Sequence, residues 1–171
     1  MGKPELWYDP LMDRTFIIGD IHGEIEALST LMSRLPELDV GDTLVFLGDY
    51  LDRGPCSAEV IEAVRVTIPE SVNAKVVALR GNHEDAWLKV IDDGWPGFVL
   101  PPNNGCRACL RSFCPDIEAR EENIQLLTGR FFPSEVVAWM RSLPFWYEDD
   151  LGIYIHAGIS KLDGRWPHPS E

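Results

Sequence analysis

Four short polar loops carry the side chains of this chain that are best suited to bind metal ions. The loops are Gly19–Gly23, Gly48–Gly54, Arg80–Glu84 and His156–Gly158. Each supplies Asp, His or Asn, which are hard or borderline metal ligands. Glycines let several such loops turn tightly and approach one point. One loop alone is equally well explained as a polar turn, but four in one short chain indicate a metal site.

The loop Gly48–Gly54 is central, because it holds Asp49, Asp52 and Arg53 directly after the apolar run Thr43–Leu47. Two carboxylates in one loop repel each other unless a cation or a proton partner is present. The loop is expected where a buried strand ends and a helix begins. Open α/β sheets bind their ligands at that edge.

The elements that must position the loops follow from the pattern of apolar residues. Each loop follows a run typical of a buried strand, and the runs are Phe16–Ile18, Thr43–Leu47, Val76–Leu79 and Ile153–Ile155. Helices are expected over 24–35, 55–68, 84–92, 106–113, 116–127 and 134–143, the second one ending at Pro69. A hairpin is expected over 145–155. The alternation of strand, loop and helix is typical of parallel βαβ units.

The composition restricts the classes of partner. A chain of 171 residues with 45% hydrophobic residues is long enough for one domain with a buried core. The net charge of −13 argues against a nucleic-acid-binding surface and against attraction to anionic lipid. No apolar run is long enough to span a membrane, and no secretory type of sequence opens the chain. We therefore expect a cytoplasmic protein without a nucleic-acid or membrane partner.

Four cysteines leave two alternatives open. Cys106, Cys109 and Cys114 lie close together, and Cys56 is the fourth. One interpretation is a zinc site. The other is a set of free thiols, two of them packed on one face of a helix, and the missing second CxxC pair favours it.

The motifs GDIHG, GDYLDRG, RGNHE and HAG occur in this order between Thr15 and Ser160. The set resembles the calcineurin-like metallophosphoesterases, in particular the branch of serine/threonine protein phosphatases and bis-nucleoside tetraphosphate hydrolases. The resemblance implies an α/β fold in which two mixed sheets pack as a sandwich with flanking helices, here without the C-terminal strands.

The resemblance also implies a ligand set for two divalent ions. Asp49 would bridge them, Asp20 and His22 would complete one site, and Asn82 and His156 the other. Oxygen and imidazole ligands together suit manganese, with iron or zinc as alternatives.

By the same resemblance, His83 protonates the leaving group. Asp52 is the carboxylate expected to orient His83, and Arg53 would hold phosphate oxygens with its planar guanidinium. Glu84 is interpreted as a carboxylate at a helix N-terminus. Arg80 is interpreted as part of a structural ion pair.

The expected function is metal-dependent hydrolysis of phosphomonoesters by a metal-bridging hydroxide. The expected substrates are serine/threonine phosphoproteins, with phosphotyrosine or small phosphoesters also open. Two alternatives remain: a bis(5'-nucleosyl)-tetraphosphate hydrolase, and a catalytically impaired metal-binding module that serves interactions.

One departure from the family pattern concerns the C-terminal side. The family has a further metal-binding His in a Gly-His pair on a later strand, whereas the only later histidine here is His168. We therefore expect residues 1–171 to form a single domain that is shortened at its C-terminus. Such a domain would bind the second metal weakly and self-associate through exposed apolar surface.

Overall fold

A parallel three-stranded sheet aligns the loops that carry the candidate ligands. The computed structural model describes residues 13–101, 103–162, 164–165 and 167–170. Strands β1 (Thr15–Ile18), β2 (Thr43–Phe46) and β3 (Lys75–Ala78) pair in the order β1-β2-β3. All three run in the same direction. Their carboxyl ends therefore meet at one edge, and the loops that follow them start side by side.

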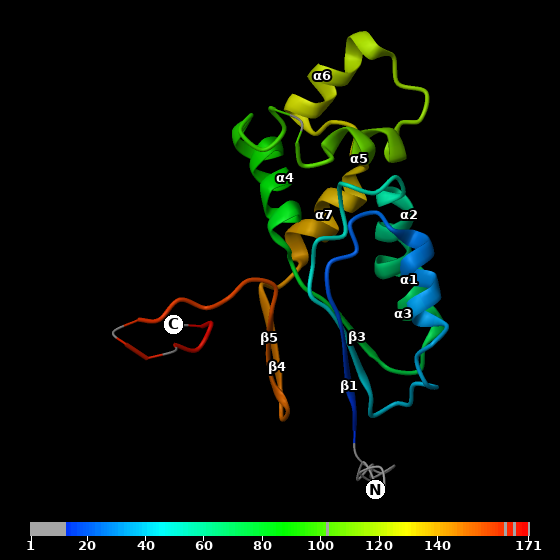
Figure 1. Ribbon diagram of the computed structural model, residues 1–171, viewed down its shortest axis with the longest axis vertical. Helices are drawn as coiled ribbons and strands as arrows, with labels where there is room; N and C mark the ends of the chain where they lie inside the picture. The colour runs from blue at the N-terminus through cyan, green and yellow to red at the C-terminus, as the bar shows by residue number, and fades with distance from the viewer. Residues whose placement is uncertain (1–12, 102, 163, 166, 171) are drawn as a thin grey trace, which may run out of the picture.

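Helices cover one face of this sheet and the edge beyond its carboxyl ends. Figure 1 shows α1, α2 and α3 on one face, and α4 to α7 beyond the ends of the strands. Their bounds are α1 (Ile25–Met32), α2 (Ser57–Glu62), α3 (Ile68–Ser71), α4 (Asn82–Asp93), α5 (Cys106–Phe113), α6 (Ala119–Thr128) and α7 (Ser134–Ser142). The core between sheet and helices includes the fully buried side chains of Leu44 and Phe46.

The expectation that Pro69 ends the second helix was wrong. The helical backbone continues from α2 through a π-helical segment, η1 (Ala63–Thr67), into α3, which ends at Ser71. Proline lacks the N–H that an α-helix interior needs. The wider π-helical turn changes the hydrogen-bond register just before Pro69, and Pro69 takes an early position of α3, where a missing N–H costs little.

A two-stranded antiparallel hairpin lies on the other side of the parallel sheet (Figure 1), and it consists of β4 (Trp146–Asp149) and β5 (Gly152–Ile155). The Thr15 hydroxyl donates to the Asp149 carboxylate at 2.7 Å, which joins the hairpin to β1. The α/β class is confirmed. In the described residues, however, one sheet is wholly parallel and the other wholly antiparallel, whereas mixed sheets were expected. Phe145 and Ile153 of this region are exposed, and self-association through it stays a prediction.

The burial of the two cysteines of α5 supports the interpretation that they are thiols packed in the core. Cys106 and Cys109 are both fully buried, and both belong to the hydrophobic core. All four cysteines are free thiols. Within the described residues, no helix has the length and apolar character needed to cross a membrane.

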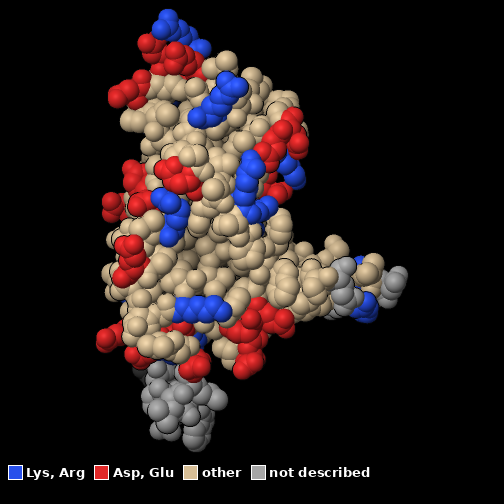
Figure 2. Space-filling model, turned by 180° about the vertical axis from the view of Figure 1, so that it is seen from behind, with Lys and Arg blue, Asp and Glu red and all other residues tan. Residues whose placement is uncertain are grey.

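Acidic and basic side chains are interspersed on the face of the molecule shown in Figure 2. This face therefore does not gather the basic side chains that a nucleic-acid backbone requires.

A part-buried ion pair between Arg14 and Asp42 lies at the amino end of the sheet and gives a stability prediction. The side chain of Asp42 is 4% exposed and accepts hydrogen bonds from the Arg14 guanidinium, from the Arg14 backbone and from the Asp39 backbone. The Arg14 side chain is the main cause that lowers the pKa of Asp42 to about 2, against the opposing effect of burial. Asp42→Asn should therefore lower the free energy of unfolding by about 2 kcal/mol at neutral pH.

The sign of the pH dependence follows from the lowered pKa of Asp42. Its contribution is complete above the unfolded pKa of about 4 and is lost as pH falls through about 2. The difference in the free energy of unfolding between the parent and Asp42→Asn, measured by urea denaturation, should therefore shrink as the pH is lowered between these two values. The exposed Asp39→Asn is the control. A difference that does not change with pH would contradict this explanation.

Candidate metal centre

Two glycines let the loops after β2 and β3 approach each other. A Cβ atom at Gly48, whose φ is +118°, would lie 2.4 Å from the backbone nitrogen of Gly81. A Cβ atom at Gly81 would lie 2.2 Å from the backbone nitrogen of Asp49. Any side chain at either position would separate the loops. The glycines therefore allow Asp49 and the start of α4 to face one site.

Four non-glycine residues of the site have left-handed backbone conformations, and they are His22, Asp49, Asp52 and Arg53, with φ of 47°, 57°, 69° and 62°. This conformation is unfavourable for residues with a Cβ atom, and it clusters at functional sites. Hydrogen bonds from the backbone of Ile21 and His22 to the Asp49 carbonyl hold the first two loops together.

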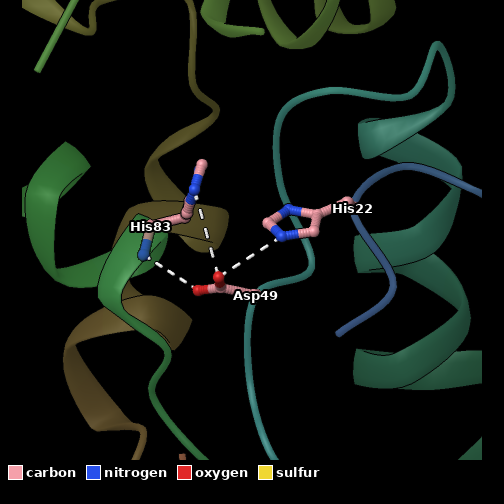
Figure 3. A group of neighbouring side chains, drawn as sticks. All are labelled: His22, Asp49 and His83. Carbon is pink, nitrogen blue, oxygen red and sulfur yellow. Dashed lines mark hydrogen bonds and ion pairs between the residues drawn. The ribbon is translucent and has the colours of Figure 1, made fainter. Parts of the chain in front are cut away.

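The carboxylate of Asp49 lies at the centre of the cluster (Figure 3) and is almost fully buried. Its Oδ2 is 3.4 Å from Nε2 of His22, and its Oδ1 is 3.5 Å from Nε2 of His156. The backbone N–H of His83 also donates to Oδ1 at 2.9 Å. The two oxygens of one carboxylate thus face imidazoles from two different loops.

Asp20 and Asn82 complete the cluster on its solvent side. Asp20 lies between the two imidazoles, with Oδ2 at 3.7 Å from Nε2 of His22 and Oδ1 at 3.9 Å from Nδ1 of His156. Oδ1 of Asn82 is 2.9 Å from Nε2 of His156. Asp20 and Asn82 are exposed, so the cluster opens to solvent here. The structure brings together all five residues predicted as metal ligands.

The donor atoms fit divalent cations. The backbone carbonyl of Leu51 lies 2.8 Å from Nδ1 of His22 and so fixes the proton there. The buried Nε2 of His22 has no hydrogen-bond partner among the described residues, and the same holds for Nδ1 of His156. A ring nitrogen lone pair that faces carboxylate oxygens is repelled unless a cation or a proton lies between them. Imidazole, carboxylate and amide donors together suit transition metals.

His83 and Asp52 form a buried pair beside this cluster. Nδ1 of His83 is 2.6 Å from Oδ2 of Asp52, and both residues are buried. Burial lowers the pKa of His83, but the hydrogen bond and the charge of Asp52 outweigh it, so the pKa is raised. Burial raises the pKa of Asp52, and the His83 contact opposes that change. Nε2 of His83 lies 4.0 Å from Oδ2 of Asp49, so the ring borders the cluster.

Glu84 has a larger part in the site than its interpretation as a helix N-terminal carboxylate predicted. It does accept the backbone N–H of Gly81 at the start of α4, at 3.0 Å. Its fully buried carboxylate also accepts the backbone N–H groups of Asp49 and Tyr50, both at 2.9 Å. Burial, with the nearby charge of Asp49, raises the pKa of Glu84 to about 7. Glu84 therefore holds the central loop against the start of α4.

The two arginines near the site, Arg53 and Arg80, differ in their contacts. Arg53 is exposed, and no described contact joins its guanidinium to the cluster, so its phosphate-binding role stays a prediction. Arg80 donates to the carbonyl of Arg141 at 2.6 Å and lies 3.8 Å from Asp85. Its guanidinium also stacks over the Phe145 ring. These contacts agree with the structural interpretation of Arg80.

His168 is held at the hairpin. Its Nε2 lies 3.0 Å from the carboxylate of Glu148, and its ring meets that of Trp146 edge-on at 4.8 Å. These two contacts hold the imidazole ring of His168 against β4.

A comparison with family models decides the family. Residues 14–163 match the model described as calcineurin-like phosphoesterase. The chain belongs to the calcineurin-like phosphoesterase family. The predicted family is therefore confirmed, and members of this family use a dinuclear metal centre.

The relatives of this family member have names that describe different activities. A protein of Aromatoleum aromaticum named symmetrical bis(5'-nucleosyl)-tetraphosphatase is 26% identical over 144 residues, which cover 84% of this chain and 44% of that protein. A Caenorhabditis elegans protein provisionally named a serine/threonine-protein phosphatase is 38% identical over 71 residues, 40% of this chain and 18% of its own.

A solved structure agrees with the fold. The cold-active protein-tyrosine phosphatase of a Shewanella species is 20% identical, with a TM-score of 0.54, and the match covers 87% of this chain and 45% of that one. The chain thus spans less than half the length of each of these three proteins.

Proposed function

We propose that this chain carries the metal centre of a metal-dependent phosphoester hydrolase, in which Asp49 would help to hold both of two divalent ions. The observation that carries the proposal is the arrangement of Asp49, whose two oxygens face the imidazoles of His22 and His156. One carboxylate shared between two ions is the arrangement that dinuclear hydrolases need.

The remaining ligands divide between the two ions. Asp20 and His22 would hold one ion, and Asn82 and His156 the other. The ions, when bound, would supply the Lewis acidity that holds phosphate oxygens and activates water. Arg53 would hold a further phosphate oxygen with its planar guanidinium.

His83 would donate a proton to the leaving oxygen from Nε2. The hydrogen bond of Nδ1 to Asp52 fixes the orientation of the ring, and the raised pKa of His83 favours the protonated form that an acid needs. The backbone N–H of His83 donates to Asp49, so the acid and the shared carboxylate keep a fixed distance.

The substrate class that we place first is bis(5'-nucleosyl) tetraphosphate. The relatives that match most of the chain carry this name. Phosphoproteins, the substrates expected from the sequence, come second and are supported by the shorter match at 38% identity. Comparing kcat/KM on diadenosine tetraphosphate and on a phosphoserine peptide discriminates the two classes. A higher kcat/KM on the phosphoserine peptide would place phosphoproteins first as the substrate class.

Metal removal tests the function itself. Protein stripped with a chelator should not hydrolyse p-nitrophenyl phosphate, and Mn²⁺ should restore turnover better than Mg²⁺. The reason is that Mg²⁺ prefers oxygen ligands and keeps its waters, whereas this site offers two imidazoles. Full turnover of stripped protein in Mg²⁺ alone would contradict the metal assignment. A protein that binds Mn²⁺ without turnover would instead be the impaired binding module.

A further inference from the structure

Asp52 is a fully buried carboxylate, and it needs hydrogen-bond donors in order to remain in place. One donor is Nδ1 of His83, at 2.6 Å from Oδ2. A second is the indole N–H of Trp87, which lies 3.0 Å from Oδ2 and 3.1 Å from Oδ1. The indole N–H therefore contacts both oxygens of the carboxylate that orients His83.

Trp87 itself is fixed by its surroundings. It lies on α4 four residues after His83, so the two side chains project from the same face of the helix. Its side chain is fully buried, and its ring meets three phenylalanine rings edge-on, those of Phe98, Phe131 and Phe132, at 5.6, 5.2 and 5.1 Å. The direction of the indole N–H is thus set by packing.

We propose that Trp87 is a positioning residue of this site. Its N–H holds the carboxylate of Asp52 in the orientation that receives the His83 Nδ1 proton, and Nε2 of His83 is thereby directed toward the cluster. Without the indole N–H, the carboxylate would lose the donor that contacts both of its oxygens, while the short hydrogen bond to Nδ1 of His83 would remain. The kinetic consequence of this inference rests on the proposed function, in which His83 is the acid.

The kinetic test uses Trp87→Phe, which removes the N–H and keeps an aromatic ring in the same pocket. Help from an acid matters most for a poor leaving group. Trp87→Phe should therefore lower kcat on phenyl phosphate on the order of tenfold, with little loss on p-nitrophenyl phosphate and with unchanged KM and metal content. Trp139→Phe is the matched control, since it removes an indole elsewhere in the structure. An equal loss on both substrates, or no loss, would overturn the proposal.

A double-mutant cycle separates positioning from general packing. In an Asp52→Asn background, Trp87→Phe should cost little further kcat, because the carboxylate that it holds is already absent. Trp87→His, whose ring can place an N–H where the indole nitrogen was, should recover part of the loss. Additive losses in the cycle would show that Trp87 acts through packing alone.

A spectroscopic test does not depend on turnover, so it decides the inference even if the proposed function fails. The imidazole N–H proton resonance of His83, identified by its loss in His83→Asn, should shift and exchange faster in Trp87→Phe. It should be unchanged in Trp139→Phe. If Trp87→Phe does not fold, the indole N–H resonance of Trp87 should shift in Asp52→Asn. An unchanged resonance in whichever of these measurements is made would overturn the proposal.

Discussion

Asp49→Asn is expected to remove metal-dependent hydrolysis completely, whereas His83→Asn should leave a measurable fraction. An amide cannot present two charged oxygens to two ions, and each oxygen of Asp49 faces a different imidazole. The acid is expected to contribute roughly 10²–10⁴-fold, which is the usual range for a proton donor. The loss in Asp49→Asn should therefore exceed about 10⁴-fold.

Metal content distinguishes the two variants independently of turnover. Elemental analysis should show that Asp49→Asn retains less metal than the parent, and that His83→Asn retains the parental amount. The exposed Asp116→Asn is the control for a lost carboxylate. Equal metal occupancy in Asp49→Asn and in the parent would contradict the shared-ligand role of Asp49.

Glu84→Gln is the second substitution with a large expected effect. Each carboxylate oxygen of Glu84 accepts backbone N–H groups, Oε2 those of Asp49 and Gly81, and Oε1 that of Tyr50. The NH₂ group of a glutamine would replace one acceptor by a donor that faces other donors. Leaving a buried donor without an acceptor costs about 1–3 kcal/mol. We expect a loss of about 3 kcal/mol in the free energy of unfolding, together with weaker metal retention.

Urea denaturation and metal titration of Glu84→Gln measure these two effects. The exposed Glu121→Gln keeps the same chemical change away from the site and should match the parent. If Glu84→Gln has the stability and the metal affinity of the parent, the Glu84 carboxylate does not hold the central loop.

The residues of the site could be predicted from the sequence where a side chain able to bind metal directly follows an apolar run. Asp20, Asp49 and Asn82 each follow an apolar run, and all three runs form parallel strands that end at the same edge. A parallel sheet brings the loops at its carboxyl ends together whatever their separation in the chain. The cluster therefore follows from a few short patterns.

Other parts depend on contacts that no local pattern contains. The hydrogen bonds of Glu84 reach residues 34 and 35 positions earlier, and the hydrogen bonds from Trp87 to Asp52 also span 35 positions. A proline usually ends a helix, but here a π-helical turn precedes Pro69 and the helical backbone continues past it. How the hairpin sits against β1 is set by side-chain contacts such as that of Thr15 with Asp149.

The central claim is that two ions share Asp49, and anomalous diffraction tests it most directly. A crystal soaked in Mn²⁺ and phosphate should show two anomalous peaks, each next to one oxygen of Asp49. Asp20 and His22 should lie at one peak, and Asn82 and His156 at the other. A single peak, or two peaks whose ligands leave out Asp49, would contradict the account.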